Sequence, residues 1–253
     1  MTISKSLSDG LLVLTLDEPA RRNPVGHESR RRLAAMLSEA ESDPAVRAAV
    51  LTGAGGHFSA GGDIREQNTL GSPIEARDRF AVMKDLIGRM VRFPKPLVAA
   101  VEGWAAGGGF ALAAACEVVV ASRRARFVSS FGKIGLMPDM GLMATLPARI
   151  GVAPSRRIFL NSMTIDAEEG HRLGLVDELT EEGEALERAS AIARVAAAEA
   201  PLPRAFVKDF LAAEVDRALE FERQMQPILL FSADAEEGRA AFFEKRKPVF
   251  RGA

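Results

Sequence analysis

The sequence predicts an α/β fold, and two patterns in the 253-residue chain support this prediction. Over roughly the first 150 residues, short apolar runs typical of buried strands alternate with longer segments of helical periodicity, as in α/β proteins. From Pro154 onward, the segments with a clear period are helical. We therefore expect a core over residues 1–195 and a C-terminal helical region over residues 196–253.

The individual elements follow from apolar runs and from the residues that interrupt them. The Asp9-Gly10 pair before an apolar run predicts a hairpin. Strands are expected at Leu11–Leu16, Ala48–Thr52, Leu97–Glu102 and Val118–Ala121. Helices are expected at Glu28–Glu41, Ile74–Val91, Phe110–Cys116, Pro154–Leu160, Asp166–Leu173, Glu182–Ala200, Pro203–Leu219 and Ala233–Lys245. We expect a mobile loop at Asn68–Ser72, and we expect the cluster Arg30-Arg31-Arg32 on a solvated helix face.

Composition and charge argue against several classes of protein. The 33 basic and 34 acidic residues give a net charge of -1, so no overall field attracts nucleic acid or an anionic membrane. The single cysteine, Cys116, excludes an intramolecular disulfide, and no side chains have metal-ligand spacing, so we expect no metal. Met1–Gly10 is polar, and the charge-free apolar stretch Gly103–Cys116 is shorter than the ~20 residues of a bilayer span. We therefore expect no membrane segment and a cytoplasmic location.

Two glycine-rich loops, each after an expected strand, are the candidate functional elements. The first, Gly53–Asp63, lacks the glycine at position 58 of a dinucleotide fingerprint and the lysine of a P-loop. The second contains Gly107–Gly109 before a helix, where free N–H groups can receive an anion or an oxyanion. A tight turn against a neighbouring element is the alternative interpretation. Taken together, the loops suggest an oxyanion hole in which Gly62 and Gly108 each donate one N–H.

Five segments, in order along the chain, carry a family resemblance. They are Phe58-Ser59-Ala60-Gly61-Gly62-Asp63-Ile64, Gly103-Trp104-Ala105-Ala106-Gly107-Gly108-Gly109, Gly135-Leu136-Met137-Pro138-Asp139, Gly174-Leu175-Val176 and the tail from Glu237 to Phe250. They resemble segments of the crotonase superfamily, the enoyl-CoA hydratase/isomerase family. The resemblance implies a crotonase-like spiral of ββα units with a C-terminal helical trimerisation region. It also implies a homotrimer or a dimer of trimers.

The same resemblance implies a substrate and a binding site. The substrate is an acyl-coenzyme A, so that coenzyme A is part of the substrate and no separate cofactor is expected. The N–H groups of Gly62 and Gly108 hold the thioester oxygen. Further positions carried over to the coenzyme A site are Arg22, Val25, Ala60, Asp63, Ile64 and Lys245, the last toward a neighbouring subunit's ligand.

The chain departs from the family's hydratases at two positions. Those enzymes carry glutamates that position a water and move its protons, whereas this chain has Ala111 and Phe131. Neither side chain can transfer a proton, so simple hydration is disfavoured. Asp139 instead occupies a position where several family members place a catalytic aspartate. The stretch Phe127–Asp139 resembles the branch that isomerises 1,2-epoxyphenylacetyl-CoA.

Asp139 has two alternative roles that the sequence leaves open. As the N-cap of a following helix it would accept backbone N–H bonds, which lower its pKa. In an apolar acyl pocket its pKa would rise toward useful basicity. Candidate lining residues of such a pocket are Trp104, Phe131, Met137 and Met140.

We expect an enoyl-CoA isomerase in which Asp139 moves a proton along the acyl chain through an enolate. Alternatives within the fold are hydratase-like, dehalogenase or hydrolase activity on another coenzyme A thioester. A non-catalytic homologue that binds coenzyme A is the alternative from a different class.

Overall fold

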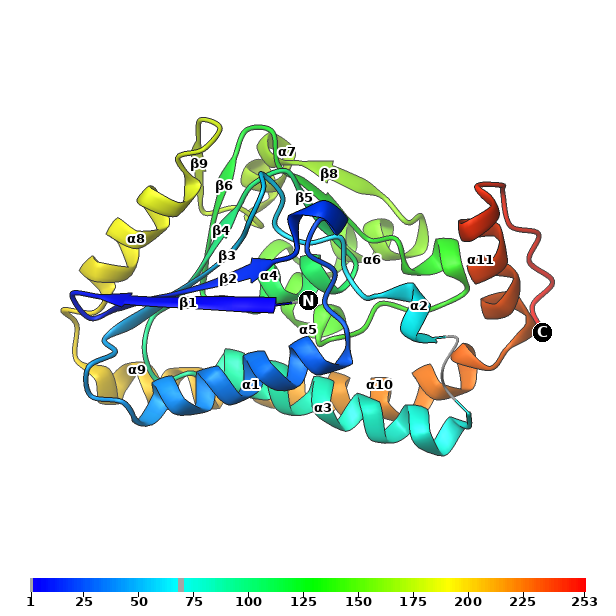
Figure 1. Cartoon of the computed structure of the whole chain (residues 1–253), viewed down its shortest axis with the longest axis horizontal. Helices are drawn as coiled ribbons and strands as arrows, with labels where there is room; N and C mark the ends of the chain where they lie inside the picture. Colours follow the sequence, from blue (N-terminus) through cyan, green and yellow to red (C-terminus); the bar gives the residue numbers. More distant parts are fainter. Residues whose placement is uncertain (1, 68–70) are drawn as a thin grey trace.

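The computed structural model describes residues 2–67 and 71–253, which form two sheets surrounded by helices (Figure 1). The larger, six-stranded sheet is parallel except for its first pair, β1 with β2. Its strands, in spatial order, are β1 (Thr2–Ser8), β2 (Leu11–Asp17), β3 (Ala48–Gly53), β4 (Leu97–Val101), β6 (Val118–Ser122) and β9 (Glu178–Thr180). The smaller sheet has the order β5 (Trp104–Ala106), β7 (Arg126–Val128) and β8 (Thr164–Asp166).

The predicted hairpin joins β1 and β2 in antiparallel register, with Ser8 opposite Leu11. Asp9 and Gly10 have φ values of +51° and +78°. Two consecutive positive φ angles match the right-handed twist of the strands, which is why an Asp-Gly pair favours this turn. The prediction is confirmed.

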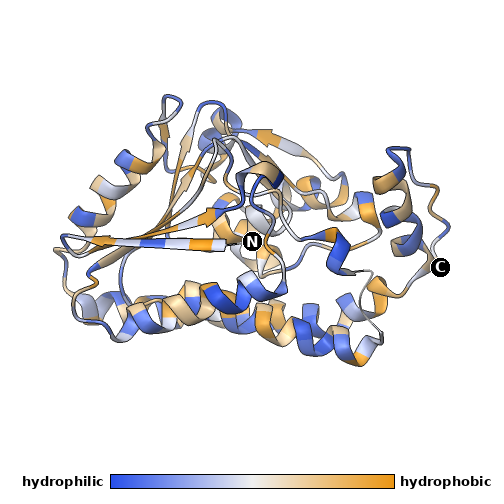
Figure 2. Cartoon of the chain, viewed as in Figure 1, coloured by the Kyte–Doolittle hydropathy of each residue, from blue (hydrophilic) through white to orange (hydrophobic). Residues whose placement is uncertain are grey.

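Both faces of the larger sheet are covered at its central strands, which explains why β3 and β4 are continuous apolar runs. On β3, Ala49 and Leu51 join the main core beneath α1 (His27–Ser42) and α3 (Pro73–Arg92). Ala48 and Val50 pack on the opposite side against α8 (Ala185–Ala196). Figure 2 shows mostly hydrophobic strands between helices that carry both hydrophilic and hydrophobic residues.

The two sheets are linked by repeated ββα units. β4 of the larger sheet leads to β5 of the smaller one and then to α4 (Gly108–Ala115). β6 leads to β7 in the same way, and α5 (Leu142–Ile150) follows after the short helix η2 (Phe131–Ile134). Each unit therefore begins a helix beside the smaller sheet, and the site described below lies there.

The remaining elements include one predicted helix that the structure divides. The expected helix Pro203–Leu219 is two helices, because the chain breaks at the buried Ala212, whose N–H bonds to both Lys208 O and Asp209 O. The expected helix Glu182–Ala200 is observed as the shorter helix α8. The short strands β5, β7, β8 and β9 and helix α5 were not predicted. The other elements are η1 (Pro19–Arg21), α2 (Ile64–Gln67), α6 (Val152–Leu160), α7 (Ala167–Leu173), α9 (Pro201–Leu211), α10 (Ala213–Leu230) and α11 (Ala233–Glu244).

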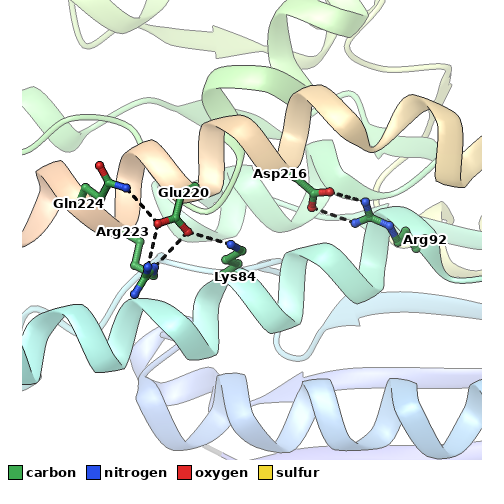
Figure 3. Close-up of polar contacts among 6 residues, drawn as sticks. All are labelled: Lys84, Arg92, Asp216, Glu220, Arg223 and Gln224. Carbon is green, nitrogen blue, oxygen red and sulfur yellow. Dashed lines mark hydrogen bonds and ion pairs between the residues drawn. The ribbon is translucent and has the colours of Figure 1, made fainter.

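Helix α10 is fixed along α3 by ion pairs (Figure 3). Lys84 Nζ lies 2.8 Å from Glu220 Oε2, and Arg92 Nη1 donates to Asp216 Oδ1 at 3.0 Å. Arg223 closes on Glu220 from the same helix. This attachment sets the position of the α10 face that points toward the core.

Part of the expected loop Asn68–Ser72, residues 68–70, lies outside the described residues. Ser72 is the N-cap of α3, and its Oγ accepts the Glu75 N–H. Within the described part of the chain, no helix is both long and apolar enough to cross a membrane. The division at residue 195 stays a prediction.

Candidate active site

The loop after β3 lies alongside β5, and this brings the two glycine-rich segments together. The Ser59 N–H donates to Trp104 O at 2.8 Å, and the Ala106 N–H donates to Ser59 O at 2.9 Å. The buried Asn23 holds the loop from the other side by donating to the carbonyl oxygen of His57 at 2.8 Å. Segments far apart in the sequence thus form one surface.

Close approach of these segments depends on glycine at two positions. A Cβ on Gly61 would lie 2.5 Å from Ala106 O, and a Cβ on Gly109 would lie 2.6 Å from Ser59 Cβ. Gly61 also has a φ of +93°, which other residues rarely adopt. A larger residue at either position would push the two loops apart.

The N–H groups of Gly62 and Gly108 are the candidate oxyanion donors. Gly62 N lies 3.6 Å from the position that a Cβ on Gly108 would occupy, so the two backbones are in contact. Gly108 is the first residue of α4, and its N–H therefore has no partner within the helix. Neither N–H donates a hydrogen bond to any described residue. Two free donors side by side at a helix N-terminus can hold a developing negative charge.

A pocket lies in front of these donors and combines an apolar wall with a few polar groups. Its apolar lining includes Ala76, Phe80, Met83, Phe131, Ile134, Leu136 and Leu230. Its polar lining includes His27, Arg30, Asp63, Glu66, Arg79, Ser130 and Asp139. This combination is typical of pockets that bind small molecules.

Asp139 reaches this pocket as a buried carboxylate, between η2 and α5. It is 9% exposed, and its Oδ2 accepts a hydrogen bond from Gln226 Nε2 at 3.1 Å. Burial raises the pKa of Asp139, while the positive charge of Arg30 and the Gln226 hydrogen bond oppose part of that rise. The group is therefore a stronger base than an ordinary aspartate.

The alternative role of Asp139 as a helix cap is wrong. The N-cap of α5 is Gly141, with a φ of +73° and no side-chain capping bond. The Leu142 N–H bonds to the main-chain oxygen of Asp139 rather than to its carboxylate. The carboxylate is thereby left to face the pocket.

Helix α10 places two buried polar side chains behind Asp139, and the sequence analysis missed both. Besides binding Asp139, Gln226 Nε2 donates to Met137 O at 2.8 Å. Glu222 is 2% exposed and accepts the Gly141 N–H with both oxygens, at 3.0 and 3.2 Å. Burial, followed by the Asp139 charge, raises the pKa of Glu222 to about 9, despite the backbone hydrogen bonds. Glu222 is thus protonated at neutral pH, which limits the negative charge beside Asp139.

The arginine cluster of α1 does not form the solvated face that was expected. Arg31 and Arg32 are exposed, but Arg30 is 9% exposed and lines the pocket. Arg30 shares the helix phase of the buried Leu33 and Leu37, three and seven residues further on. That spacing is the signal that could have identified it.

His27, the first residue of α1, is a second pocket residue that the analysis missed. Its Nδ1 is buried without a hydrogen-bond partner among the described residues. Burial lowers the pKa of His27, and the charges of Arg79 and Arg30 lower it further. The imidazole is neutral at pH 7, and nothing in the sequence pattern distinguishes it.

Four of the expected substrate-binding residues line the pocket and four do not. The four that line it are Ala60, Asp63, Ile64 and Phe131. Trp104 is 37% exposed on β5 and lies outside the lining. Arg22, exposed, and Val25, buried, lie beside it, with their main chains bonded to Ala60 and Gly61. Lys245 is the exposed C-cap of α11, and its contact with coenzyme A stays a prediction.

No cluster of histidine, cysteine, aspartate and glutamate within residues 2–67 and 71–253 has a geometry suited to a metal ion. Cys116 is buried, and burial raises the pKa of its thiol to about 12. It is a core residue rather than a nucleophile.

The two sheets and the ββα units that link them form the crotonase fold, which solved enoyl-CoA hydratases share. The family described as Enoyl-CoA hydratase/isomerase matches residues 6–253. The chain therefore belongs to the enoyl-CoA hydratase/isomerase family, whose members act on coenzyme A thioesters.

Individual relatives carry both activity names. The chain is 34% identical over 262 residues to a 1,2-epoxyphenylacetyl-CoA isomerase of Escherichia coli K12, covering 99% of this chain and 98% of that one. It is 36% identical to a putative enoyl-CoA hydratase of Thermus thermophilus, covering 94% and 96%. Its fold matches the crystal structure of an enoyl-CoA hydratase from Mycobacterium avium subsp. paratuberculosis with a TM-score of 0.88. That match has 31% identity and covers 98% of both chains.

Proposed function

We propose that this chain is a coenzyme A thioester isomerase that uses Asp139 as its base. The observation that carries the proposal is the buried carboxylate of Asp139, which shares one pocket with the free N–H groups of Gly62 and Gly108. The thioester oxygen binds the two N–H groups, and the adjacent carbon faces Asp139. Coenzyme A enters as part of the substrate, and no separate cofactor takes part.

The reaction balances with one carboxylate. Asp139 takes a proton from the carbon next to the thioester, and the electron pair moves onto the carbonyl oxygen as an enolate. Gly62 and Gly108 stabilise that oxygen. The loss of one such N–H donor typically lowers the rate by a factor of ~10²–10³. The protonated Asp139 then returns the proton two carbons along the chain, and the double bond moves.

The side chains around the pocket support isomerisation over hydration. Hydration needs groups that hold a water and move its protons. Ala111 is fully buried in α4, and Phe131 presents a ring to the pocket. Among the lining residues, burial raises the pKa of the Asp139 carboxylate, which makes it the stronger candidate for the base. The isomerase name of the Escherichia coli relative agrees with this assignment.

The deciding experiment compares the wild type with Asp139→Asn on 3-enoyl-CoA thioesters and on thioesters of 1,2-epoxyphenylacetate. Asparagine keeps the size of the side chain but cannot accept the proton. We expect turnover and solvent deuterium exchange at the α-carbon to fall by ~10²–10⁴, with binding of a saturated acyl-CoA retained. Turnover equal to that of the wild type would exclude Asp139 as the base.

We also propose that the chain forms a homotrimer or a dimer of trimers. Helix α9 has no buried residue, although it carries large apolar side chains. The exposed apolar residues of α9 are Leu202, Phe206, Val207, Phe210 and Leu211. An apolar surface of this kind normally lies against another protein. Light scattering on the wild type and on a Phe206→Glu/Phe210→Glu double variant tests this, because the double variant is expected to be smaller.

A further inference from the structure

Arg30 carries a buried positive charge that no described residue neutralises in an ion pair. It is 9% exposed in α1, and its Nε is buried with no hydrogen-bond partner within residues 2–67 and 71–253. Across the described residues, no carboxylate lies within ion-pair distance of its guanidinium. A buried arginine in this state has donors available to a ligand.

The guanidinium lies next to the oxyanion donors. Its Nη2 is 3.3 Å from the position that a Cβ on Gly62 would occupy. The charges of Asp139 and Glu66 attract it, and Arg79 opposes them. Asp139 and Arg30 line the same pocket, so an acyl group that reaches the base also passes the guanidinium.

The chemistry of the acyl group decides whether this arrangement is favourable. A hydrocarbon chain displaces water from the guanidinium and offers its N–H groups no hydrogen-bond acceptor. The guanidinium keeps its proton, so its N–H groups lose water without gaining a hydrogen-bond acceptor. The attraction of Asp139 and Glu66 from beyond ion-pair distance does not replace those hydrogen bonds, so this desolvation is unfavourable. An acyl oxygen at the same place accepts a charge-assisted hydrogen bond instead.

We propose that Arg30 selects acyl groups that carry a second oxygen acceptor close to the thioester and disfavours hydrocarbon chains of the same shape. The inference rests on the proposed acyl-coenzyme A site and adds the class of substrate. The acceptor is a carboxylate or a neutral carbonyl oxygen, because the oxygen lone pairs of both groups accept hydrogen bonds from the guanidinium N–H groups.

Three saturated thioesters of nearly identical shape test the inference by equilibrium binding. They are 4-methylpentanoyl-CoA, 4-oxopentanoyl-CoA and freshly prepared succinyl-CoA. Their dissociation constants are measured by calorimetry for the wild type, Arg30→Met and Arg30→Lys. Arg31→Met is the matched control, because Arg31 is the exposed neighbour on the same helix. Saturated ligands make the readout independent of turnover.

We expect the wild type and Arg31→Met to bind at least one oxygenated thioester about tenfold more tightly than 4-methylpentanoyl-CoA. Arg30→Met is expected to lose this preference and to bind the hydrocarbon thioester more tightly. Arg30→Lys keeps the charge but not the planar fork, and we expect it to reduce the preference about threefold or more. The Arg30→Lys variant therefore tests the inference even if Arg30→Met does not fold. A preference for succinyl-CoA alone assigns a carboxylate, and a preference for both assigns carbonyl oxygens in general.

An unchanged preference in Arg30→Met, or no preference in the wild type, overturns the role of Arg30 and leaves the acyl-coenzyme A site standing. If none of the three thioesters binds more tightly than free coenzyme A, the acyl site itself is absent. The proposed function then fails together with the inference. The two failures are therefore distinguishable.

Discussion

Gln226 donates a hydrogen bond from Nε2 to Oδ2 of Asp139 at 3.1 Å, although the two residues are 87 positions apart in the chain. The same amide group donates to Met137 O, while Gln226 Oε1 accepts the Met137 N–H at 3.3 Å. Helix α10 thereby fixes both the carboxylate and the backbone that carries it. A group held in this way is oriented before the substrate arrives, which is what proton transfer requires.

The first prediction concerns the pH dependence of Gln226→Met. The Gln226 hydrogen bond favours the charged form of Asp139, so removing it raises the pKa of Asp139 further above its ordinary value. Proton abstraction needs the charged form, and activity is lost as pH falls through this pKa. We expect the acid limb of the kcat/KM profile to move to higher pH. Gln224→Met, on the exposed side of α10, is the control and leaves the profile unchanged.

A Gln226→Met profile that coincides with the wild-type profile would show that Asp139 is not the titrating base. A lower rate with the same acid limb would lead to the same conclusion about the titrating base and would assign Gln226 a structural role in addition.

The polar residues around Asp139 were partly predictable from helix phase. Glu222 and Gln226 share one face of α10 with the buried Val215, Leu219 and Leu230. A polar residue at a buried phase signals a partner in the core. The helix predicted from the sequence ends at Leu219, so Glu222 and Gln226 lie beyond its end.

The second prediction concerns Gly108→Ala. A Cβ at this position would lie 2.9 Å from Met140 Sδ and 3.6 Å from Gly62 N, so the methyl group crowds the oxyanion hole. Gly108 does not have a positive φ, and the backbone itself tolerates alanine. We expect kcat to fall by ~10²–10³ with the fold retained.

The control for Gly108→Ala is Gly88→Ala in the middle of α3, where the nearest contact of a Cβ is 3.8 Å away. It should leave kcat unchanged. Equal activity of Gly108→Ala and the wild type would remove Gly108 from the proposed mechanism.

The third prediction concerns the junction between α11 and η2. A Cβ on Gly238 would lie 2.6 Å from the backbone of Ile134, a pocket residue, so alanine forces the helix away. Overpacking of this kind typically lowers the free energy of unfolding by about 1–3 kcal/mol. Urea denaturation measures the change for Gly238→Ala. Gly88→Ala is the control and should be neutral or slightly stabilising. Unchanged stability in Gly238→Ala would mean that α11 packs more loosely than the structure shows.

The long apolar strands of the larger sheet were predictable, whereas its edge strand β9 and the smaller sheet were not, for a physical reason. Strands such as β3 and β4 are buried on both faces, so each is a continuous apolar run. The strands of the smaller sheet have three residues each, too few for any alternation to be visible. The break between α9 and α10 at Ala212 contains neither glycine nor proline, so no local residue indicates that the helix ends there.

The two glycine loops were predictable from their motifs, whereas their contact depends on the fold. Gly61 lies close to Ala106, and Gly109 lies close to Ser59, because neither glycine has a Cβ. These contacts join segments from different ββα units. Local sequence shows that glycine is present and does not show what it touches.

The last prediction concerns Glu222→Gln and the pH dependence of stability. Burial raises the pKa of Glu222 from 4.5 to about 9 in the folded protein, whereas the unfolded chain ionises near 4.5. Between these values the folded state binds a proton that the unfolded state has released, so Glu222 makes the protein less stable as pH rises. Glutamine is neutral at every pH and removes this effect. We expect the Tm of Glu222→Gln minus that of the wild type to be smallest near pH 5 and to grow toward pH 8.

The matched control, Glu220→Gln, should show the opposite sign from two residues away on the same helix. Hydrogen bonds from Arg223 and Lys84 hold the pKa of Glu220 well below its ordinary value (Figure 3). Its contribution to stability is present above the unfolded pKa and is lost as pH falls. Glu220→Gln should therefore lower Tm at pH 7, and this deficit should shrink on acidification. Thermal scans between pH 5 and pH 8 measure the slope for Glu222→Gln, and scans continued below the unfolded pKa of 4.5 measure the slope for Glu220→Gln. A flat difference for Glu222→Gln would mean that Glu222 is ionised in the folded protein, and Asp139 would then have a second negative charge beside it.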